Sequence, residues 1–316
     1  MGITLIFPLA YLLDLVFGDP VWPGHPVRLI GWLIASLEKR MILWKVNKIL
    51  SGLMLVVLVV GITAVSIYSI LKLAGFIHIY LYYFVSVLFI YFSLSAKQLG
   101  VEANKVYSAL ETEDLAGGRK ALSMIVARDT DNLDEPQVIR ATVETVAEST
   151  MDGVVAPLCY AFLGGPVLAW VYKAINTLDS MVGYRNEKYI NFGKVSASLD
   201  ALVNFIPAKI TCFLIALSAF FCGKDGLRAL KWAAEYIFKG PKSNSEATEA
   251  AMAGALKVQL GGLNFYNTAP ILKTHIGDNL YPLDKKHIRE SVKVMYLASG
   301  LFVFGIIFIA YFIGGR

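Results

Sequence analysis

Long runs without a charged side chain alternate with polar stretches along this chain. Four such runs lie between Lys48 and Lys72, Lys72 and Lys97, Asp152 and Lys173, and Lys293 and Arg316. Each is close to the ~20 residues that a helix needs to cross the hydrocarbon core of a bilayer. The runs therefore predict membrane-spanning helices over residues 50–71, 75–95, 154–172 and 294–313.

Two further apolar runs are less regular. Residues 203–222 reach spanning length only when Pro207 is included, and residues 3–17 are short and contain Pro8 and Asp14. The second run lacks the charged start and the small-residue cleavage site of a signal peptide. We interpret it as a retained helix that is buried or half-inserted.

The polar stretches at 97–152, 173–202 and 224–293 have helical spacing and no convincing alternation typical of strands. Two of them contain a capping box, Asp134 with Gln137 and Ser243 with Glu246, which bonds the free N–H groups at a helix start. We expect helices over about 135–149 and 244–258. The fold class is all-α: a polytopic integral membrane protein, one membrane-integrated domain over 1–316, in which helical cytoplasmic segments form the site.

Composition supports a membrane protein and excludes other classes. Hydrophobic residues make up 56% of the 316 residues and charged residues 17%, and the mean hydropathy is +0.59; soluble domains average roughly 45–50% and about 25%. The net charge of +5 is too small to indicate nucleic-acid binding by charge alone. The three cysteines lie in apolar runs without C-x-x-C spacing, as small buried hydrophobic residues do.

Charge also orients the chain. Residues 21–48 and 224–293 have the excess of Lys and Arg that is typical of cytoplasmic loops. The two predicted spans 50–71 and 75–95 cross the membrane and return, so residues 97–152 lie on the cytoplasmic side as well. The basic stretch 173–202 breaks this scheme, because two flanking spans would place it outside. Gly164-Gly165-Pro166 and Pro207 interrupt those spans, and broken helices occur in a membrane only where they line protein or a watery cavity. We expect shallow or re-entrant helices that open to the cytoplasm.

The common nucleotide and zinc motifs G-x-x-x-x-G-K-[ST], G-x-G-x-x-G and H-E-x-x-H are absent. Instead, Arg140, Glu144, Glu148 and Asp152 recur at four-residue spacing and share one face if the helix continues that far. Three carboxylates in line favour a counter-ion such as Mg²⁺, and this face leads into a membrane segment. A solvated acidic face is the alternative.

A second candidate cluster follows the run 154–172. Lys173, Asn176 and Asp179 share a helical face at a depth where ionisable residues are costly and are commonly partnered or functional; a snorkelling Lys with a surface Asp is the alternative. Cations then alternate with aromatic residues at Tyr184, Arg185, Lys188 and Tyr189. They could bind phosphate and stack on a planar ligand, or form an interfacial aromatic belt with basic anchors.

Three shorter groups complete the candidates. The first is a helix start with Lys242, Ser243 and Asn244; helix starts favour anions, so either an anion site or simple capping is expected there. The second is the pair Arg128 and Asp129, which precedes the acidic helix. The third surrounds the first membrane entry and consists of Asp14, Asp19, His25 and Arg28. His25 is a candidate general base, although lone histidines are more often structural.

Five strings, spread over most of the chain, resemble the adenosylcobinamide-phosphate synthase family of cobalamin biosynthesis. They are LDLVFGDP-x-x-x-x-HPVRLIG (13–31), ARDTDNLD (127–134), VETVAESTMDGVVAPLCYAFLGGP (143–166), YKAINTLDSMVGYRNEKYINFGKVSASLDALVNFIPAK (172–209) and PKSNSEATEAAMAGALKVQLGGLNFY (241–266). Long co-linear strings are more specific than any short motif. The hairpin at 49–96 and the C-terminal helix are the variable parts.

The resemblance implies a multi-pass ligase of the cell (plasma) membrane with its active face in the cytoplasm. It would join adenosylcobyric acid to (R)-1-aminopropan-2-ol or its O-phosphate, with ATP and Mg²⁺, to give adenosylcobinamide or adenosylcobinamide phosphate. Family members commonly have an acid pair after "SA-x-LD", where this chain has Asp200-Ala201, so the role of a second acid is in doubt.

The needs of that reaction assign roles to the candidates. Mg²⁺ would be held by Glu144, Asp152 and Asp179. The amine's proton would go to His25, Asp129 or Glu148. Tyr184, Tyr189 and Phe192 could face the corrin. Phosphates and substrates would be bound by Arg28, Arg128, Lys173, Asn176, Tyr184, Arg185, Lys188, Tyr189, Lys242, Ser243 and Asn244.

Two other classes remain open. A transporter or corrinoid-binding membrane subunit would also have an intramembrane acid such as Asp14 and a broken segment such as Gly164-Gly165-Pro166. A non-catalytic signalling paralogue of the same fold should lack the string at 241–266, which this chain retains. The expected partners are the corrinoid acid, the amine and the lipid bilayer, with no nucleic acid; a homo-oligomer is compatible with the sequence.

Overall fold

The structure is a computed structural model that describes residues 5–20, 22, 24–44, 46–184, 186–238, 243–266 and 269–314. The chain forms two compact units. Unit 1 comprises Met1–Ser95, Asp152–Phe205 and Val303–Arg316, and unit 2 comprises Ala96–Met151 and Ile206–Phe302. Two helices, α9 and α12, contribute residues to both units.

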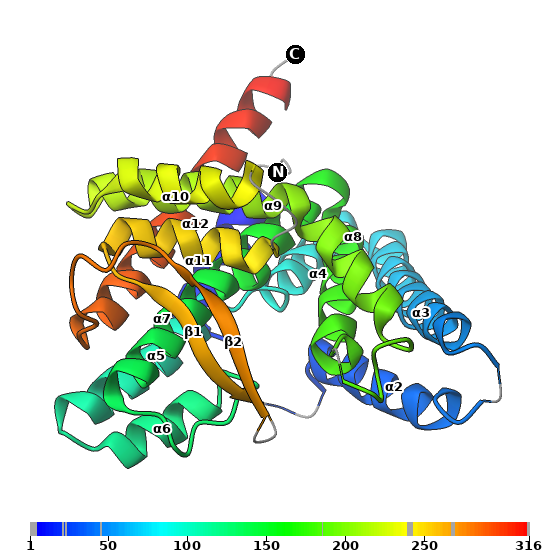
Figure 1. The fold of residues 1–316 in the computed structure, drawn as a ribbon. Helices are drawn as coiled ribbons and strands as arrows, with labels where there is room; N and C mark the ends of the chain where they lie inside the picture. Colours follow the sequence, from blue (N-terminus) through cyan, green and yellow to red (C-terminus); the bar gives the residue numbers. More distant parts are fainter. Residues whose placement is uncertain are drawn as a thin grey trace. The chain divides into compact units, whose positions relative to one another are not determined.

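The protein is almost entirely helical, as the sequence predicts (Figure 1). Its helices are α1 (Ile6–Phe17), α2 (Pro26–Met41), α3 (Lys48–Ile77), α4 (Ile79–Tyr91), α5 (Ala96–Glu111), α6 (Leu115–Ser123), α7 (Glu135–Thr150), α8 (Ala156–Val182), α9 (Lys194–Phe221), α10 (Gly226–Phe238), α11 (Asn244–Leu256) and α12 (Lys286–Gly314). A π-helical turn, Met151–Val155, joins α7 to α8 along the chain.

Five helical segments of the described chain are long and apolar enough to cross a membrane. They are Lys48–Ile77, Ile79–Glu111, Glu135–Val182, Lys194–Phe221 and Lys286–Phe312. The shorter helix α1 occupies the N-terminal run in which only residues 5–17 are described. The polytopic membrane class predicted from the apolar runs is confirmed.

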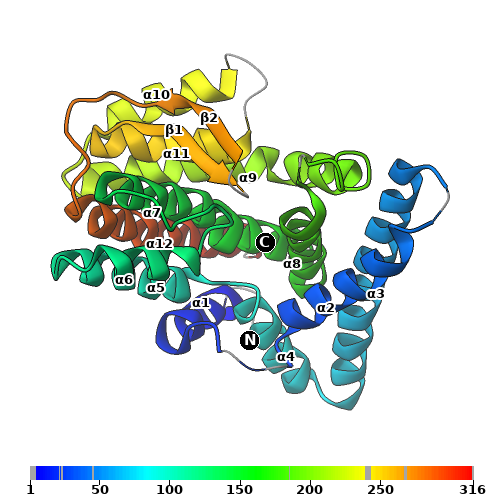
Figure 2. The same ribbon diagram turned by 60° about the horizontal axis from the view of Figure 1, so that its bottom comes forward.

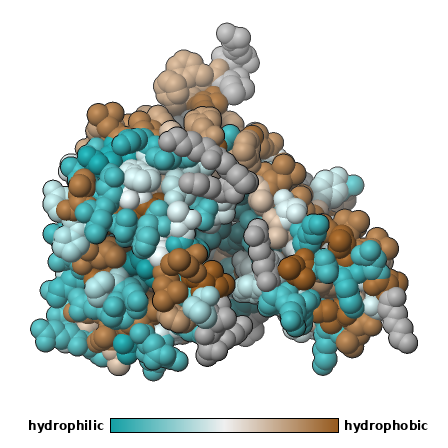
Figure 3. Space-filling model, viewed as in Figure 1, coloured by the Kyte–Doolittle hydropathy of each residue, from teal (hydrophilic) through white to brown (hydrophobic). Residues whose placement is uncertain are grey.

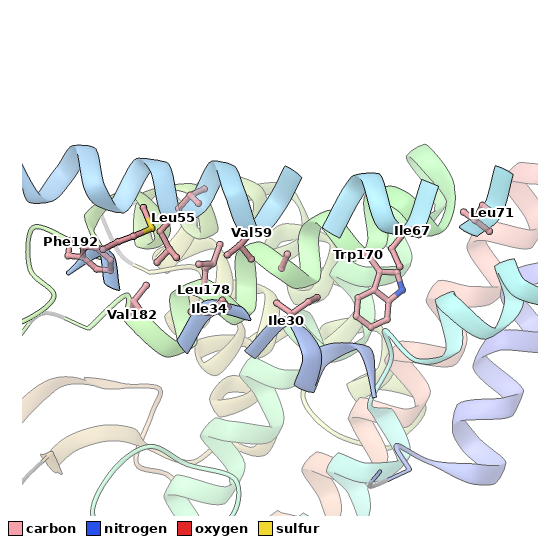
Figure 4. Close-up of a cluster of buried hydrophobic side chains, with 13 residues drawn as sticks. Ile30, Ile34, Leu55, Val59, Ile67, Leu71, Trp170, Leu178, Val182 and Phe192 are labelled. Carbon is pink, nitrogen blue, oxygen red and sulfur yellow. The ribbon is translucent and has the colours of Figure 1, made fainter. Parts of the chain in front are cut away.

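The core of unit 1 is an apolar cluster between α2, α3 and α8 (Figure 4). Trp170 is fully buried, and its indole N–H donates to the Phe89 carbonyl at 2.8 Å. Gly52 allows the closest approach in this cluster, because a Cβ there would lie 1.9 Å from the Phe192 carbonyl oxygen. The cluster therefore fixes the turn after α8 against α3.

Apolar side chains also cover faces that have no protein partner in the described structure. Phe76 at the end of α3 is 89% exposed and Phe304 on α12 is 66% exposed. Figure 3 shows brown, hydrophobic side chains at the surface, including around the C-terminal end of α12. Surfaces of this kind are unfavourable in water and suited to lipid.

The break predicted at Gly164-Gly165-Pro166 is confirmed within α8. Gly164 and Gly165 have non-helical backbone angles, and Gly165 adopts φ 65° and ψ −162°. That conformation is essentially restricted to glycine. By contrast, α9 continues through Pro207, and the Thr211 hydroxyl donates to the Pro207 carbonyl at 2.8 Å.

We expect Gly165→Ala to destabilise the protein by about 1–3 kcal/mol, because alanine cannot adopt this conformation without strain. Thermal unfolding in detergent would measure the change. Gly61→Ala is the matched control: Gly61 lies within α3, and a Cβ there would have no neighbouring atom within 4 Å, so alanine should raise stability slightly. A Gly165→Ala protein at least as stable as wild type would contradict the strain.

In unit 2 both predicted capping boxes are confirmed. Asp134 accepts from the Gln137 N–H and Gln137 accepts from the Asp134 N–H, each at 2.9 Å. Ser243 and Glu246 make the same reciprocal pair at the start of α11. These local signals fix where the two site-bearing helices begin.

The expectation that strands are absent is wrong in one place. β1 (Leu260–Tyr266) and β2 (Ala269–Ile276) form an antiparallel hairpin with an irregular register between Leu260 and Gly262. The hairpin contacts α11 and α7, and Figure 1 shows it beside α11. In Figure 2 it lies in front of α10 and α11. It supplies backbone groups to the cluster described next.

Candidate functional site

Unit 2 contains a carboxylate clamped between two arginines. Glu144 on α7 is 1% exposed, and its Oε2 lies 2.7 Å from Nη1 of Arg128. Its Oε1 lies 3.7 Å from Nε of Arg140 and accepts the Gly261 N–H at 2.8 Å. Both arginine side chains are also nearly buried, 8% and 11% exposed. A charge at this depth is stable only when it is paired and hydrogen-bonded.

The β-hairpin holds both arginines in place. Arg128 donates to the Asn264 Oδ1 at 2.7 Å, and Arg140 donates to the Leu263 carbonyl at 2.6 Å. Gly261 has φ 78°, and a Cβ there would lie 2.1 Å from a β2 carbonyl. The loop before α7, the face of α7 and β1 therefore form one continuous polar cluster.

A second buried carboxyl lies in the same unit. Glu249 on α11 is 1% exposed, and its Oε2 accepts no hydrogen bond from the described residues. The Lys273 ammonium on β2 lies 4.0 Å from its Oε1. Burial raises the pKa of the Glu249 carboxyl well above its ordinary value of 4.5; Lys273 acts in the opposite direction, and the Glu144 carboxylate adds to the rise. The Glu249 carboxyl therefore holds its proton more tightly than an exposed glutamate does.

This raised pKa predicts a pH-dependent stability. The folded protein keeps a proton on Glu249 at pH values where the unfolded chain has lost it, so stability falls as the pH rises above about 4.5. The slope is at most about 1.4 kcal/mol per pH unit for one proton. Urea unfolding between pH 5 and about 8 should show this fall in wild type and a shallower one in Glu249→Gln. Identical slopes would refute a buried neutral acid.

Unit 1 contains a chain of hydrogen bonds between the π-helical turn, α8 and α9. The Tyr172 hydroxyl lies 3.2 Å from Oδ1 of Asp152 and 3.0 Å from Oδ1 of Asn204. Asn204 donates to Asp200 at 3.0 Å, and Asn176 donates to the same carboxylate at 3.4 Å. Tyr172 and Asn204 are each 1% exposed. The network thus joins Asp152 and Asn176, two residues singled out from the sequence.

Lys173 on α8 lies among acidic side chains of the same unit. It interacts electrostatically with Asp152, Asp19 and Asp14. Asp19 also lies 2.9 Å from Nε2 of His25, whose side chain is 4% exposed and packs edge-on against Phe92. The N-terminal acids, the buried histidine and the start of the second candidate cluster are therefore one electrostatic group.

The aromatic–cationic stretch after α8 is anchored to α2. Lys188 lies 2.8 Å from Oε1 of Glu38, and the Tyr189 hydroxyl donates to the same oxygen at 2.8 Å. The Lys188 ammonium also lies 4.5 Å from the centre of the Tyr189 ring. Hydrogen bonding to Glu38 raises the pKa of Lys188, so this amine stays cationic.

The other residues predicted from the sequence have simpler surroundings. Asp129, Glu148, Arg28 and Tyr184 are exposed, and the Asp129 N–H donates to the Phe265 carbonyl. Ser243 caps α11, and Asn244 is its first residue. Phe192 lies in the apolar core rather than on a corrin-binding surface. Arg185 and Lys242 lie outside the described residues.

The proposed metal ligands belong to different units: Glu144 lies in unit 2, and Asp152 and Asp179 lie in unit 1. Among the described residues, no group of three or more His, Cys, Asp or Glu side chains is placed to hold a metal ion. Sequence reasoning missed Glu249, Lys273, Asn264, Tyr172 and Asn204. Each lies within or beside a string quoted above, but an amide, a hydroxyl or a single acid in an apolar helix has no distinctive spacing.

Five apolar helices and two clusters of buried charge define the chain as a polytopic membrane protein with buried polar clusters. The sequence profile of the CobD/Cbib protein family matches residues 7–295, and the chain belongs to this family. The resemblance seen in the sequence strings is confirmed.

Curated relatives carry one name. A Geobacter metallireducens protein, "cobalamin biosynthesis protein CobD", is 47% identical over 294 residues, which cover 93% of this chain and 92% of the relative. A protein of that name from Klebsiella pneumoniae is 43% identical, and the match covers 94% of this chain and 94% of the relative. One from Clostridium perfringens is 42% identical, and the match covers 93% of each. No solved structure matches the chain.

Proposed function

We propose that this chain acts in cobalamin biosynthesis as an ATP-dependent amide ligase that joins adenosylcobyric acid to (R)-1-aminopropan-2-ol or its O-phosphate. The observation that carries the proposal is the family match over nearly the whole chain, with relatives named for cobalamin biosynthesis. The buried charges support an enzyme, because ionisable residues at such depth are costly unless they serve a function.

The reaction defines what the site must do. A carboxylate does not accept an amine at neutral pH, so a propionate oxygen of the corrinoid attacks the γ-phosphorus of ATP and releases ADP. The amine nitrogen then attacks the acyl phosphate carbon, phosphate leaves, and the nitrogen loses a proton to a base. Cations must offset the phosphoryl charge, and the base must lie within reach of the amine.

The residues of this chain offer groups for each need. Mg²⁺ enters with ATP as part of the substrate, and phosphate oxygens leave only one or two positions for carboxylates, for which Asp152 is our first choice. Lys173 beside it would offset phosphoryl charge. His25 would take the amine's proton, with Asp19 orienting the imidazole from 2.9 Å. In unit 2, Arg128 is already paired with Glu144, so we assign it a positioning role.

The test uses the full chain in nanodiscs with adenosylcobyric acid, MgATP and either the free or the phosphorylated amine. Mass spectrometry should detect adenosylcobinamide or its phosphate, together with ADP, only when all three substrates are present; the better amine identifies the natural one. Uptake of corrinoid into sealed vesicles without ATP consumption would instead establish a transporter. Absence of both activities would favour a non-catalytic paralogue.

We also propose that the active face is cytoplasmic in the plasma membrane. The basic excess of residues 21–48 and 224–293 supports this orientation. Cysteines introduced at Lys188 and Lys194 should react with an impermeant maleimide only in inverted membrane vesicles. Reaction in intact cells would reverse the assignment.

A further inference from the structure

Unit 2 contains a cavity that shares no lining residue with the Glu144 cluster. Its volume is about 490 Å³, within the usual range of small-molecule sites. It lies where α9 ends, α10 begins, α11 ends and α12 begins. The walls come from Phe220, Gly223, Lys224, Asp225, Gly226, Leu227, Ala255, Leu256, Lys257, Tyr281, Lys286, His287 and Glu290.

Cations outnumber acids around this cavity. Three lysines face two carboxylates; burial lowers the pKa of the remaining titratable residue, His287, so it adds no positive charge near neutral pH. Lys224 lies 2.5 Å from Glu290, and Lys257 lies 3.3 Å from Asp225. Hydrogen bonding by the Arg228 N–H, followed by that of Lys257, holds the pKa of the Asp225 carboxyl below its ordinary value. Lys286 leaves the cavity with an excess of positive charge.

Lys257 occupies an unusual backbone position. It ends α11 with φ 60° and ψ 34°, the left-handed conformation that helix ends normally assign to glycine. Among the described non-glycine residues, only Glu113 shares a positive φ. A strained residue that persists commonly serves a site. Here the strained residue directs an ammonium group to the cavity.

Two helix starts and an apolar wall complete the cavity. Gly226 begins α10 and Lys286 begins α12. Asp225 and Asp284 already accept the Arg228 and Lys286 N–H groups, so the lysines rather than the helix starts would bind an anion. Phe220, Leu227 and Tyr281 supply apolar and aromatic surface. An anion with an organic group attached matches both kinds of wall.

We propose that this cavity binds the phosphate-ester group of a small molecule, with a nucleotide as the favoured source and an anionic lipid headgroup as the other. Lys224, Lys257 and Lys286 would neutralise the phosphate, and Phe220 or Tyr281 would contact the base. The phosphate donor of the proposed function would bind beside Asp152 and Lys173 in unit 1, so this cavity in unit 2 would be a second phosphate-binding site. The binding test below does not depend on ligation.

Lysine protection is the direct test. The full chain in zwitterionic nanodiscs is treated with an amine-reactive reagent, with and without MgATP, and the modified lysines are quantified by mass spectrometry. MgATP should slow modification of Lys224, Lys257 and Lys286 several-fold while exposed Lys120 on α6 reacts unchanged. A parallel sample in nanodiscs with anionic lipid tests the other source: protection there without MgATP assigns the phosphate to lipid. Equal modification in all samples overturns the proposal.

Two variants should change the affinity for MgATP in opposite directions. Lys257→Gly removes the ammonium at a position that suits glycine, so folding is retained and MgATP affinity should fall about tenfold, the typical effect of one charge-assisted contact. Glu290→Gln frees Lys224 and should raise the affinity several-fold, whereas Lys120→Ala should change it less than about twofold. Unchanged affinity in Lys257→Gly overturns the nucleotide assignment. Ligation by Lys257→Gly with the wild-type KM for ATP agrees with a second site, whereas loss of ligation at retained stability would contradict it.

Discussion

Replacing Glu144 with glutamine should lower the free energy of unfolding by about 3–5 kcal/mol, the typical cost of removing one member of a buried ion pair. Arg128 and Arg140 would remain almost fully buried, with Asn264 and a carbonyl as neutral partners. Their desolvation would no longer be offset by a negative charge. We expect amide formation to fall in parallel, because the loop that carries Arg128 loses its anchor.

Glu249→Gln is a closely matched control. Glu249 is as buried as Glu144 and lies in the same unit, but burial raises the pKa of its carboxyl well above its ordinary value. A neutral amide should therefore cost less than at Glu144, and the stability of Glu249→Gln relative to wild type should increase as the pH rises. Thermal and urea unfolding of both variants at pH 8 would separate them. Equal destabilisation would mean that both carboxyls are ionised. Lost activity at unchanged stability in Glu144→Gln would give Glu144 a chemical role.

Asn204→Leu is expected to have the second large effect. Leucine has a similar volume, but it removes the acceptor for Tyr172 and the donor to Asp200. A buried group that loses all its partners costs about 1–3 kcal/mol; Tyr172 keeps Asp152 and Asp200 keeps Asn176, so we expect a total loss of about 1–3 kcal/mol. Because Asp152 belongs to the same network, ligase activity should fall by more than the stability loss explains. Exposed Asn132→Leu is the control and should be nearly neutral.

Asn204→Asp distinguishes a network from simple packing. It would place a second carboxyl within about 3 Å of Asp200, and two such carboxyls cannot both ionise. The variant should therefore be unstable at pH 8 and regain stability as the pH falls and the pair takes up a proton. A stability loss that does not depend on pH would argue that Asn204 only fills space.

The membrane helices could be predicted because an uncharged run of spanning length has few other outcomes. The starts of α7 and α11 could be predicted because a capping box acts over four residues. The hairpin β1–β2 could not: its first strand, LGGLNFY, contains two glycines and lacks clean alternation. It is held by distant groups, such as Arg140 on the Leu263 carbonyl.

The sequence analysis identified several residues of the candidate site but not which of them bind each other. Arg128 and Glu144 were both selected, but for separate roles with phosphate and metal, whereas they bind each other at 2.7 Å. That pairing depends on the loop before α7 folding back over its helix, which no spacing encodes. Asp200, to which the sequence analysis assigned no role, accepts two asparagine amides. Glu249 lacked a signal because one acid among alanines resembles any solvated position.

The junction of α9, α10 and α11 is made of the smallest side chains in the protein. Ala216, Ala219, Ala229 and Ala255 pack there, and a Cβ on Gly254 would lie 2.6 Å from the Arg228 carbonyl oxygen. In a saturation mutagenesis library, almost no substitution of Gly254 or Ala229 should therefore give a folded protein. Leu227 is 70% exposed and should accept most replacements. In distantly related sequences, the backbones of these three helices should therefore keep their spacing at this junction, while the positions of the surrounding helices change.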